Sequence, residues 1–339
     1  MSQKIRVLIA DTFDPWFNLA TEDWIFRDMD PEVKVLFLWR NSDTVVIGRF
    51  QNPFTECNTA KMDADNVKLA RRQSGGGAVF HDLGNTNFTF MSGKSSYDKT
   101  ENNEIIIRAL AHFGVKAYAS GRNDICVEKE DGPRKISGSA FKETKDRAFH
   151  HGTLLIDANL SRLANYLNPD KKKLVSKGVQ SVRSRVANLT EFKSDITNDA
   201  LCDQIIKEFF KFYESECDVE YLDYDYLKTV PALNEYYEKL KDWKWRFGET
   251  PKFTHTLDER FEWGGMEVHI DSHKGMIKDV RIFSDSLHPE MIELLSTNLV
   301  GKEYNAQGIS MACHETVLEL PMIEEYVKDF SNWIGNKIS

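Results

Sequence analysis

The chain has 339 residues, of which 41% are hydrophobic and 29% charged, with a formal net charge of −9. This composition is typical of a globular protein long enough for two domains, and it excludes a disordered or fibrous chain. The acidic balance argues against non-specific nucleic-acid binding, which depends on cations that neutralise phosphates. No apolar run approaches the ~20 residues that span a bilayer, and the N-terminal apolar stretch ends at Asp11. We therefore expect a cytoplasmic protein with neither nucleic acid nor a membrane as a partner.

The first part of the chain alternates between helix-like and strand-like stretches. Residues Leu19–Met29 have a helical pattern with Asn18 placed to cap it, and Val33–Trp39 is a β-branched and aromatic run typical of a strand. Val67–Ala70 and Ala78–Phe80 are further strand-like runs. The glycines between these last two runs therefore lie at a strand connection.

Two longer helices are predicted further along the chain. Residues Glu104–Phe113 carry apolar side chains at helical spacing, and Gly114 follows where a left-handed cap would sit. A stripe of apolar residues from Leu201 to Phe212 indicates an amphipathic helix packed on a sheet.

A domain boundary is predicted near residue 250. The pattern breaks at Gly248 and Pro251, and two strand-like stretches at 262–271 and 276–283 follow. Helix-like segments at 290–298 and 321–334 complete this part, which is typical of a small α+β module. The predicted domains are residues 1–247 and 253–339.

The five cysteines are odd in number and scattered, at Cys57, Cys126, Cys202, Cys217 and Cys313. None of them forms the C-x-x-C pair that a zinc site or a redox motif uses. We therefore predict free, buried thiols.

Three consecutive glycines, Gly75 to Gly77, follow Arg71 and Arg72. A glycine inside a regular element costs roughly 0.5–1 kcal/mol relative to alanine, so the triplet predicts a turn or a ligand close to the backbone. The segment lacks the P-loop pattern and the βαβ context of a dinucleotide site. Main-chain N–H groups beside cations suit a phosphate or a slim ligand, whereas the alternative is a flexible hairpin turn. Strand alternation directs the two arginines to opposite faces, so we expect only one to reach a ligand.

Lys135 lies among Ile136, Gly138 and Ala140, a pattern that indicates a strand or hairpin. A partly enclosed lysine there would serve as a point charge for carboxylate and phosphate oxygens, and the alternative is a solvated hairpin lysine. The adjacent His150 and His151 would face opposite sides of a strand without a third ligand, which argues against zinc. No Ser-His-Asp arrangement or G-x-S-x-G motif supports an acyl-enzyme route.

Four segments carry a family resemblance: SGGGAVFHDLGN at 74–85, GRND at 121–124, RKISGSA at 134–140 and HHGTLL at 150–155. With DPWFNLA at 14–20, NYLNPDKKKL at 165–174, SVRSRV at 181–186 and LDERF at 257–261, they resemble lipoate–protein ligase A in order along almost the whole chain. The resemblance is to the long bacterial form, within the biotin/lipoate ligase superfamily. It implies an α+β fold with a mixed-sheet catalytic domain and a small α+β C-terminal accessory domain.

Members of this family use ATP to convert lipoate into lipoyl-AMP. They then pass the lipoyl group to one lysine of an acceptor lipoyl domain, on E2 subunits of 2-oxoacid dehydrogenases or on the glycine cleavage H protein. The resemblance therefore implies ATP and Mg²⁺ as cofactors, lipoate as substrate and acceptor lipoyl domains as partners, and we expect a monomer. Such chemistry needs no enzyme nucleophile, which agrees with the missing triad.

The resemblance also assigns residues. Lys135 matches the essential lysine of the family and would bridge the lipoate carboxylate and the α-phosphate of ATP. The positions that align with ATP or adenylate contacts are Arg72, Gly77, Ala78, Val79 and Phe80, followed by Asn85, Asp124 and His151. Gly75 and Gly76 would leave room for the lipoate chain, and Asp124 is also a candidate ligand of Mg²⁺. A mobile loop that closes over the adenylate aligns with Ser176, Lys177, Gly178, Val179, Gln180, Ser181, Val182 and Arg183.

Three alternatives stay open. A biotin–protein ligase would carry an arginine-rich G-R-G-R loop, which is absent here. An octanoyl transferase of the same superfamily would act without ATP. A non-catalytic lipoate-binding protein would bind the ligand without releasing pyrophosphate.

Overall fold

The computed structural model describes residues 3–121, 123–167, 186–247, 255–273 and 276–338. The chain divides into two compact units. The first comprises residues 1–46, 54–71 and 79–246, and the second comprises residues 47–53, 72–78 and 247–339. Two short segments from the N-terminal half, one of them containing the glycine triplet, therefore group with the C-terminal residues.

The first unit is built on an eight-stranded sheet. Its strands are β1 (Ile5–Ala10), β2 (Lys34–Trp39), β6 (Asn85–Gly93), β7 (Ala117–Ser120), β8 (Asp124–Lys129), β9 (Gly132–Glu143), β10 (Arg147–Leu155) and β11 (Val219–Leu222). They lie in the order β11-β1-β2-β6-β10-β9-β8-β7, with β1 parallel to both of its neighbours and the other pairs antiparallel. This mixed sheet confirms the predicted fold class.

A smaller sheet has the order β4-β3-β5. Its strands are β3 (Thr44–Ile47), β4 (Lys68–Arg71) and β5 (Val79–His81). Helices in this part of the chain are α1 (Pro15–Asp28), α2 (Pro53–Glu56), α3 (Thr59–Ala64), α4 (Lys99–His112), α5 (Leu160–Tyr166), α7 (Asn198–Tyr213), α8 (Asp225–Thr229), α9 (Pro231–Lys241) and α10 (Trp243–Phe247), with 3-10 turns at Lys94–Ser96 and Leu189–Glu191. No helix within the described ranges has the length and apolar content to cross a membrane.

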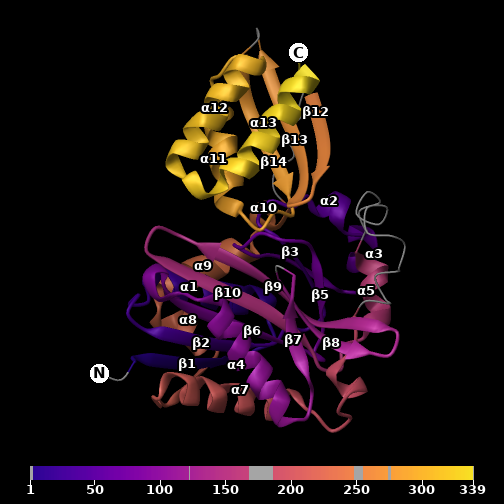
Figure 1. The fold of residues 1–339 in the computed structure, drawn as a ribbon, viewed down its shortest axis with the longest axis vertical. Coiled ribbons are helices and arrows are strands. Elements are labelled where there is room, and N and C mark those ends of the chain that lie inside the picture. Colours follow the sequence, from indigo (N-terminus) through magenta and orange to yellow (C-terminus); the bar gives the residue numbers. More distant parts are fainter. Residues whose placement is uncertain (1–2, 122, 168–185, 248–254, 274–275, 339) are drawn as a thin grey trace. The chain divides into compact units, whose positions relative to one another are not determined.

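Helices cover both faces of the large sheet (Figure 1). On one face, α4 and α7 share a core with Leu36 and Leu38 of β2. On the other face, α1 and α9 share a core with Phe37 and Trp39 of the same strand. Successive side chains of β2 thus belong to two different cores, as in a strand buried on both sides. We call these surfaces the α4 face and the α1 face.

Helix α1 begins earlier than the sequence pattern predicts. Pro15 occupies the first turn, where a missing N–H costs nothing, and the Asp14 carboxylate accepts a hydrogen bond from the Trp16 main-chain N–H at 3.0 Å. The prediction that Asn18 caps the helix is therefore wrong. Asn18 lies inside the helix, fully buried, and its side-chain amide donates to the Arg40 carbonyl oxygen at 2.7 Å.

The two other predicted helices of this unit are confirmed. Gly114 adopts φ +80° after α4, as the left-handed cap requires. Leu201, Ile205 and Phe209 of α7 are fully buried in the core of the α4 face. The apolar stripe therefore packs as its spacing predicts.

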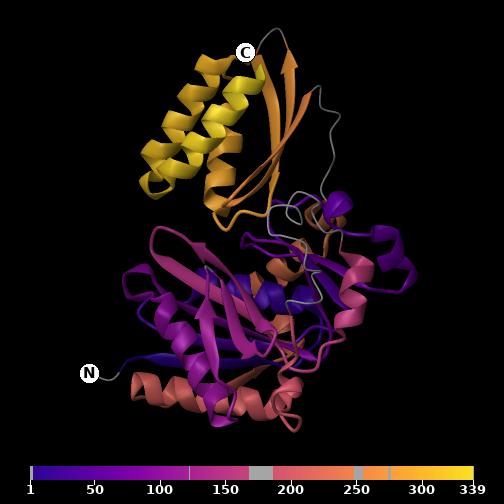
Figure 2. The same ribbon diagram turned by 45° about the vertical axis from the view of Figure 1, so that its right-hand side comes forward.

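In the second unit, the antiparallel strands β12 (His255–Phe261), β13 (Gly264–His273) and β14 (Met276–Ser284) form a sheet. Helices α11 (Pro289–Leu299), α12 (Ala306–Glu319) and α13 (Glu324–Ile338) lie on one side of this sheet (Figure 2) and share one apolar core with it. The predicted α+β character of this part is confirmed, whereas β12 and α12 escaped prediction. The five cysteines are free as predicted, but Cys202 and Cys217 are only partly buried, so the prediction of buried thiols holds for the other three. Burial raises the pKa of the Cys57 thiol to about 12.

Candidate active site

Lys135 lies in β9 and forms an ion pair across the β8–β9 hairpin. Its Nζ is 2.6 Å from Oδ1 of Asp124, and the two side chains are 35% and 34% exposed. The side chain runs along its own strand, because a Cβ placed on Gly138 would lie 2.7 Å from Lys135 Nζ. The predicted strand position is confirmed. The lysine is held by a carboxylate above a glycine rather than extended into solvent.

A register shift explains how these two residues meet. Asp124 lies opposite Gly138, but Cys126 lies opposite Lys135, so β9 contains one extra residue at this point. The shift brings Lys135 and Asp124 to the same face of the hairpin. The predicted mobile loop, residues 176–183, lies outside the described residues, and the described chain resumes at Val186, which pairs with Lys135.

Gly138 provides the room that the Lys135 ammonium occupies. We expect Gly138→Ala to displace this ammonium, because the new methyl group would overlap both Nζ at 2.7 Å and Cε at 2.8 Å. Because a lysine side chain is flexible, the variant should still fold. We expect its enzymatic activity to fall about tenfold, because the ammonium no longer lies where catalysis needs it. Unchanged activity together with unchanged thermal stability would contradict this placement.

His151 shares a face with the Lys135 ammonium. It lies directly opposite Ala140 of β9, and Gly138 is two residues before Ala140 on the same side of the strand. Gly138 and Ala140 are therefore about 6.5 Å apart along β9. The neighbouring Phe149 packs edge-on against Phe26 of α1, with ring centroids 5.0 Å apart, which identifies this surface as the α1 face.

The two adjacent histidines have different surroundings, as their alternation predicts. His150 is fully buried on the opposite face between the rings of Phe88 and Phe141, at 5.4 and 4.8 Å. This burial lowers the pKa of His150 to about 3, so the imidazole is neutral. Nδ1 of His151 lies 2.8 Å from Oε1 of Glu22, which is a residue of α1. Of the described residues, no three His, Cys, Asp or Glu side chains form a metal-binding group.

The glycine triplet belongs to the second unit, and its three glycines have different roles there. A Cβ on Gly75 would lie 2.0 Å from the carbonyl oxygen of Ser286, so the backbones touch at this point. Gly76 adopts φ +91° and its N–H donates to the same Ser286 oxygen at 2.9 Å. A Cβ on Gly77 would meet no atom of the described residues within 4 Å. Gly75 and Gly76 are buried, whereas Gly77 is half-buried and leaves room for a ligand.

The two arginines before the triplet bind different groups. In the second unit, Nη2 of Arg72 donates to the carbonyl oxygens of Gly75 at 2.6 Å and Gly77 at 2.9 Å. In the first unit, Arg71 donates to the carbonyl oxygens of Trp245 and Arg246 at 2.9 and 2.8 Å. Arg72 thus stabilises the conformation of the glycine loop, whereas Arg71 binds the main chain at the C-terminal end of the first unit.

The remaining predicted residues lie along β5 and the start of β6. Val79 and Ala78 are half-buried, and Phe80 is buried against the ring of Tyr166 at 5.2 Å. Asn85 is fully buried, and its Oδ1 has no hydrogen-bond partner among the described residues. An acceptor in this state needs a donor from outside the described protein groups.

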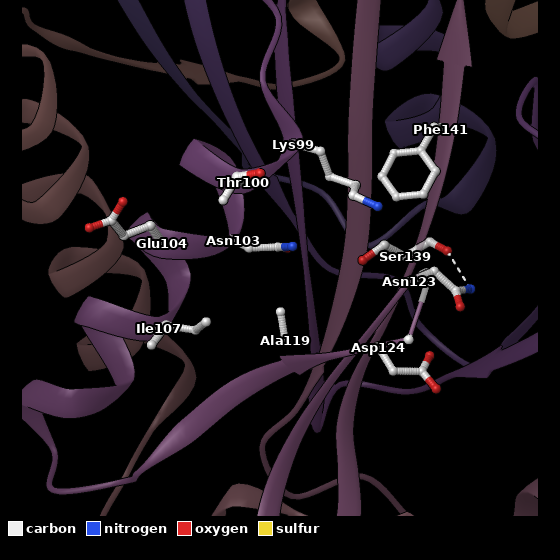
Figure 3. A pocket seen from close by; sticks show the side chains of 11 residues that line it. Lys99, Thr100, Asn103, Glu104, Ile107, Ala119, Asn123, Asp124, Ser139 and Phe141 are labelled. Carbon is white, nitrogen blue, oxygen red and sulfur yellow. Dashed lines mark hydrogen bonds between the residues drawn. The ribbon is translucent and has the colours of Figure 1, made fainter.

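A cavity of about 350 Å³ opens on the α4 face, between α4 and strands β7 to β9 (Figure 3). Lys99 extends its ammonium toward the ring of Phe141, 5.1 Å from the centroid, and Ser139 lines the same wall. Ser139 and Phe141 alternate with Ala140, which faces His151, so this wall of the cavity lies on the other side of β9 from His151. Asp124, the partner of Lys135, also lines the cavity.

The residues that hold His151 were not predicted from the sequence. Glu22, Thr89 and Trp39 come from α1, β6 and β2 and converge only in the fold. One signal was present, since Glu22 lies in a helix whose inner positions are otherwise mostly uncharged. An acidic residue that is buried needs a partner, and here that partner is His151.

The comparisons with known proteins agree with these observations. Residues 14–210 match the family model of the lipoyl protein ligase A/B catalytic domain, and residues 250–334 match that of the bacterial lipoate protein ligase C-terminus.

Solved structures extend the similarity to almost the full chain. Plasmodium falciparum LipL1, in complex with lipoate, is 35% identical with a TM-score of 0.86, covering 98% of this chain and 99% of that one. A bipartite lipoate protein ligase from Thermoplasma acidophilum, described with its E2 lipoyl domain, is 26% identical over 75% of this chain and 100% of that one, with a TM-score of 0.64. A lipoate–protein ligase A bound with ATP is also 26% identical, over 73% and 99%, with a TM-score of 0.60. The chain therefore belongs to the lipoate–protein ligase family of enzymes and carries both the catalytic domain and the C-terminal domain of that family.

Proposed function

We propose that this chain uses ATP to convert lipoate into lipoyl-AMP and then transfers the lipoyl group to a lysine of an acceptor lipoyl domain. The acceptors would be E2 subunits of 2-oxoacid dehydrogenases or the glycine cleavage H protein. Similar proteins were solved with lipoate and with ATP, and another is described together with its E2 lipoyl domain, which supports this choice of substrates and partner.

The observation that carries the proposal is the position of the Lys135 ammonium over Gly138, paired with Asp124. In adenylation the lipoate carboxylate attacks the α-phosphate, so two anions must approach each other. A compact ammonium between them lowers this repulsion and stabilises the charge that grows on the phosphoryl oxygens. Asp124 keeps the ammonium in place until the substrates bind.

The glycine loop would supply the remaining nucleotide contacts. The main chain of Gly77 to Phe80 offers N–H groups, and the Arg72 guanidinium brings positive charge to the loop. Mg²⁺ would accompany ATP and neutralise phosphate charge. Asp124 fits as a ligand, because Mg²⁺ usually binds one or two carboxylates together with substrate phosphates. His151 and Asn85 would contact the adenylate, and Gly75 and Gly76 would border the lipoate chain.

We further propose a cytoplasmic monomer with a catalytic domain at residues 1–247 and an accessory domain at 253–339. The net charge of −9 is consistent with small-molecule and protein partners rather than nucleic acid.

One assay tests the proposed function. The purified chain is incubated with an apo lipoyl domain, lipoate, ATP and Mg²⁺, and the acceptor is weighed by mass spectrometry. We expect a lipoyl increment that requires ATP. Transfer of an octanoyl group without ATP would instead identify an octanoyl transferase, and a biotin increment would identify a biotin ligase. Lipoate binding without any increment would leave a non-catalytic lipoate-binding protein.

A further inference from the structure

Helix α5 packs against strand β5 of the first unit and holds it at two points. The first is Asp82, directly after the strand, whose Oδ2 accepts a hydrogen bond from the main-chain N–H of Asn159 at 2.8 Å, at the residue that precedes α5. The second is Phe80, whose ring packs against that of Tyr166, the last residue of α5, with centroids 5.2 Å apart. Phe80 is 7% exposed and Tyr166 is 1% exposed, so water is excluded from this contact.

A guanidinium from the same helix completes the contact. Arg162 lies one helical turn before Tyr166 and has its Cζ 5.3 Å from the centroid of the Phe80 ring. The same atom is 5.5 Å from the centroid of the Tyr166 ring. A cation over an aromatic face is attracted by the ring electrons, so the guanidinium stabilises both rings where they meet.

Two carboxylates fix the guanidinium and the phenol. Nη1 of Arg162 lies 2.6 Å from Oδ2 of Asp43, which directly precedes β3. Nη2 of Arg162 donates to the Tyr166 hydroxyl oxygen at 3.1 Å, and this hydroxyl donates to Oδ2 of Asp65, at the end of α3, at 2.8 Å. A guanidinium only donates, so the hydroxyl accepts from Arg162 and directs its own proton to Asp65. Groups from three separate elements thus hold one orientation of the Arg162 and Tyr166 side chains.

The strand that these side chains support follows the glycine loop. Phe80 lies opposite Val45 of β3, so main-chain pairing holds β5 on one edge while its Phe80 ring is held by α5. Gly77, three residues earlier, is half-buried and leaves room for a ligand. The main chain between these residues therefore runs from an accessible loop into a fixed strand.

We infer that Arg162 and Tyr166 are positioning residues of the nucleotide site, which hold the main chain of Phe80 where ATP binds. This inference rests on the proposed function, in which the main chain of Gly77 to Phe80 contacts the nucleotide. Neither side chain needs to touch ATP, because both act through the buried Phe80 ring. In the proposed function lipoate borders other residues, so a displaced Phe80 should weaken the binding of ATP and leave the binding of lipoate unchanged.

The experiment measures the two substrates separately and without turnover. Isothermal titration calorimetry gives the Kd for ATP in the absence of lipoate and the Kd for lipoate in the absence of ATP. We expect Arg162→Ala to raise the Kd for ATP about tenfold, because a hydrogen bond to a charged group commonly contributes that factor or more. The Kd for lipoate should change by less than about twofold. In pyrophosphate release, the KM for ATP should rise in parallel and the KM for lipoate should not.

Tyr166→Phe separates the hydroxyl from the ring. The ring still packs on Phe80, and only the link between Arg162 and Asp65 is lost, so the Kd for ATP should rise about threefold, as for one neutral hydrogen bond. Arg162→Lys keeps the charge without the planar fork and should recover part of the affinity that Arg162→Ala loses. These two variants also keep the inference testable should Arg162→Ala fail to fold.

Arg6→Ala is the matched control. Arg6 pairs with Glu220 at 2.6 Å on β1 and β11, and its side chain is 34% exposed, close to the 28% of Arg162. Its removal costs a similar ion pair far along the sheet order from β9, and the Kd for ATP should not change.

Three results would each overturn the inference: an unchanged Kd for ATP in both Arg162→Ala and Tyr166→Phe, an equal loss of ATP and lipoate affinity, or the same loss of ATP affinity in Arg6→Ala. The second and third would show that these residues support the fold as a whole. Failure of the proposed function is distinguishable, because the wild-type chain itself would then not bind ATP.

Discussion

Replacing Lys135 by alanine is expected to slow lipoyl-AMP formation by about 10²–10³-fold, the cost of removing one preorganised group that stabilises transition-state charge. The loss has two parts. The ammonium no longer offsets the repulsion between carboxylate and phosphate, and Asp124, now without its ion pair, adds a negative charge beside them. Pyrophosphate release with lipoate, ATP and Mg²⁺, in the absence of acceptor, measures this step alone.

Two variants control for charge and position. Lys129→Ala removes a lysine of β8 that pairs with Glu191 at 2.5 Å, and adenylation should be unchanged because exposed ion pairs contribute little. Lys135→Arg keeps the charge, but a planar guanidinium is larger than the ammonium that Gly138 accommodates, so we expect little rescue. A folded Lys135→Ala variant that retains more than about a fifth of wild-type adenylation would show that the charge lies elsewhere.

Local patterns were sufficient to predict the elements that rest on periodicity. The stripe of α7 and the cap at Gly114 follow from helical geometry alone, and the position of Lys135 in a hairpin follows from the residues beside it. The start of α1 was misplaced because Asn18 is a good cap by type, whereas Asp14 and Pro15 provide the cap in the fold. Strand β12 was missed because its exposed or half-exposed residues alternate without a clear apolar face.

Contacts between residues far apart in the sequence could not be predicted. The sequence alone does not explain why residue 75 is a glycine. The carbonyl oxygen of Ser286, which lies far along the chain, leaves no room for a Cβ at Gly75. In the same way, the Glu22–His151 pair joins α1 to β10 and depends on the sheet order that places Thr89 beside them. The family resemblance assigned a ligand to each of the three glycines, whereas Gly75 and Gly76 are buried and Gly77 is half-buried.

Gly75→Ala is expected to destabilise the second unit by about 1–3 kcal/mol, the usual cost of forcing extra atoms into a packed site. The new methyl group would lie 2.0 Å from the Ser286 oxygen, 3.0 Å from its carbon and 3.1 Å from the Leu287 Cα. All three are main-chain atoms, so no side-chain rotation relieves the overlap and the loop must shift. A chemical denaturation curve monitored by tryptophan fluorescence measures the change in the free energy of unfolding.

Gly77→Ala should show the opposite pattern, which makes it the informative partner. Its Cβ would meet no atom of the described part of the chain within 4 Å, and its backbone is not among the positive-φ glycines, so stability should stay constant or rise by up to about 1 kcal/mol. The methyl group would instead project where the proposed nucleotide approaches, so the KM for ATP should rise. If Gly77→Ala destabilises the protein as much as Gly75→Ala, or leaves the KM unchanged, the open side of Gly77 does not face ATP. If Gly75→Ala lowers stability and Gly77→Ala raises the KM for ATP, then Gly75 serves packing and Gly77 serves nucleotide binding.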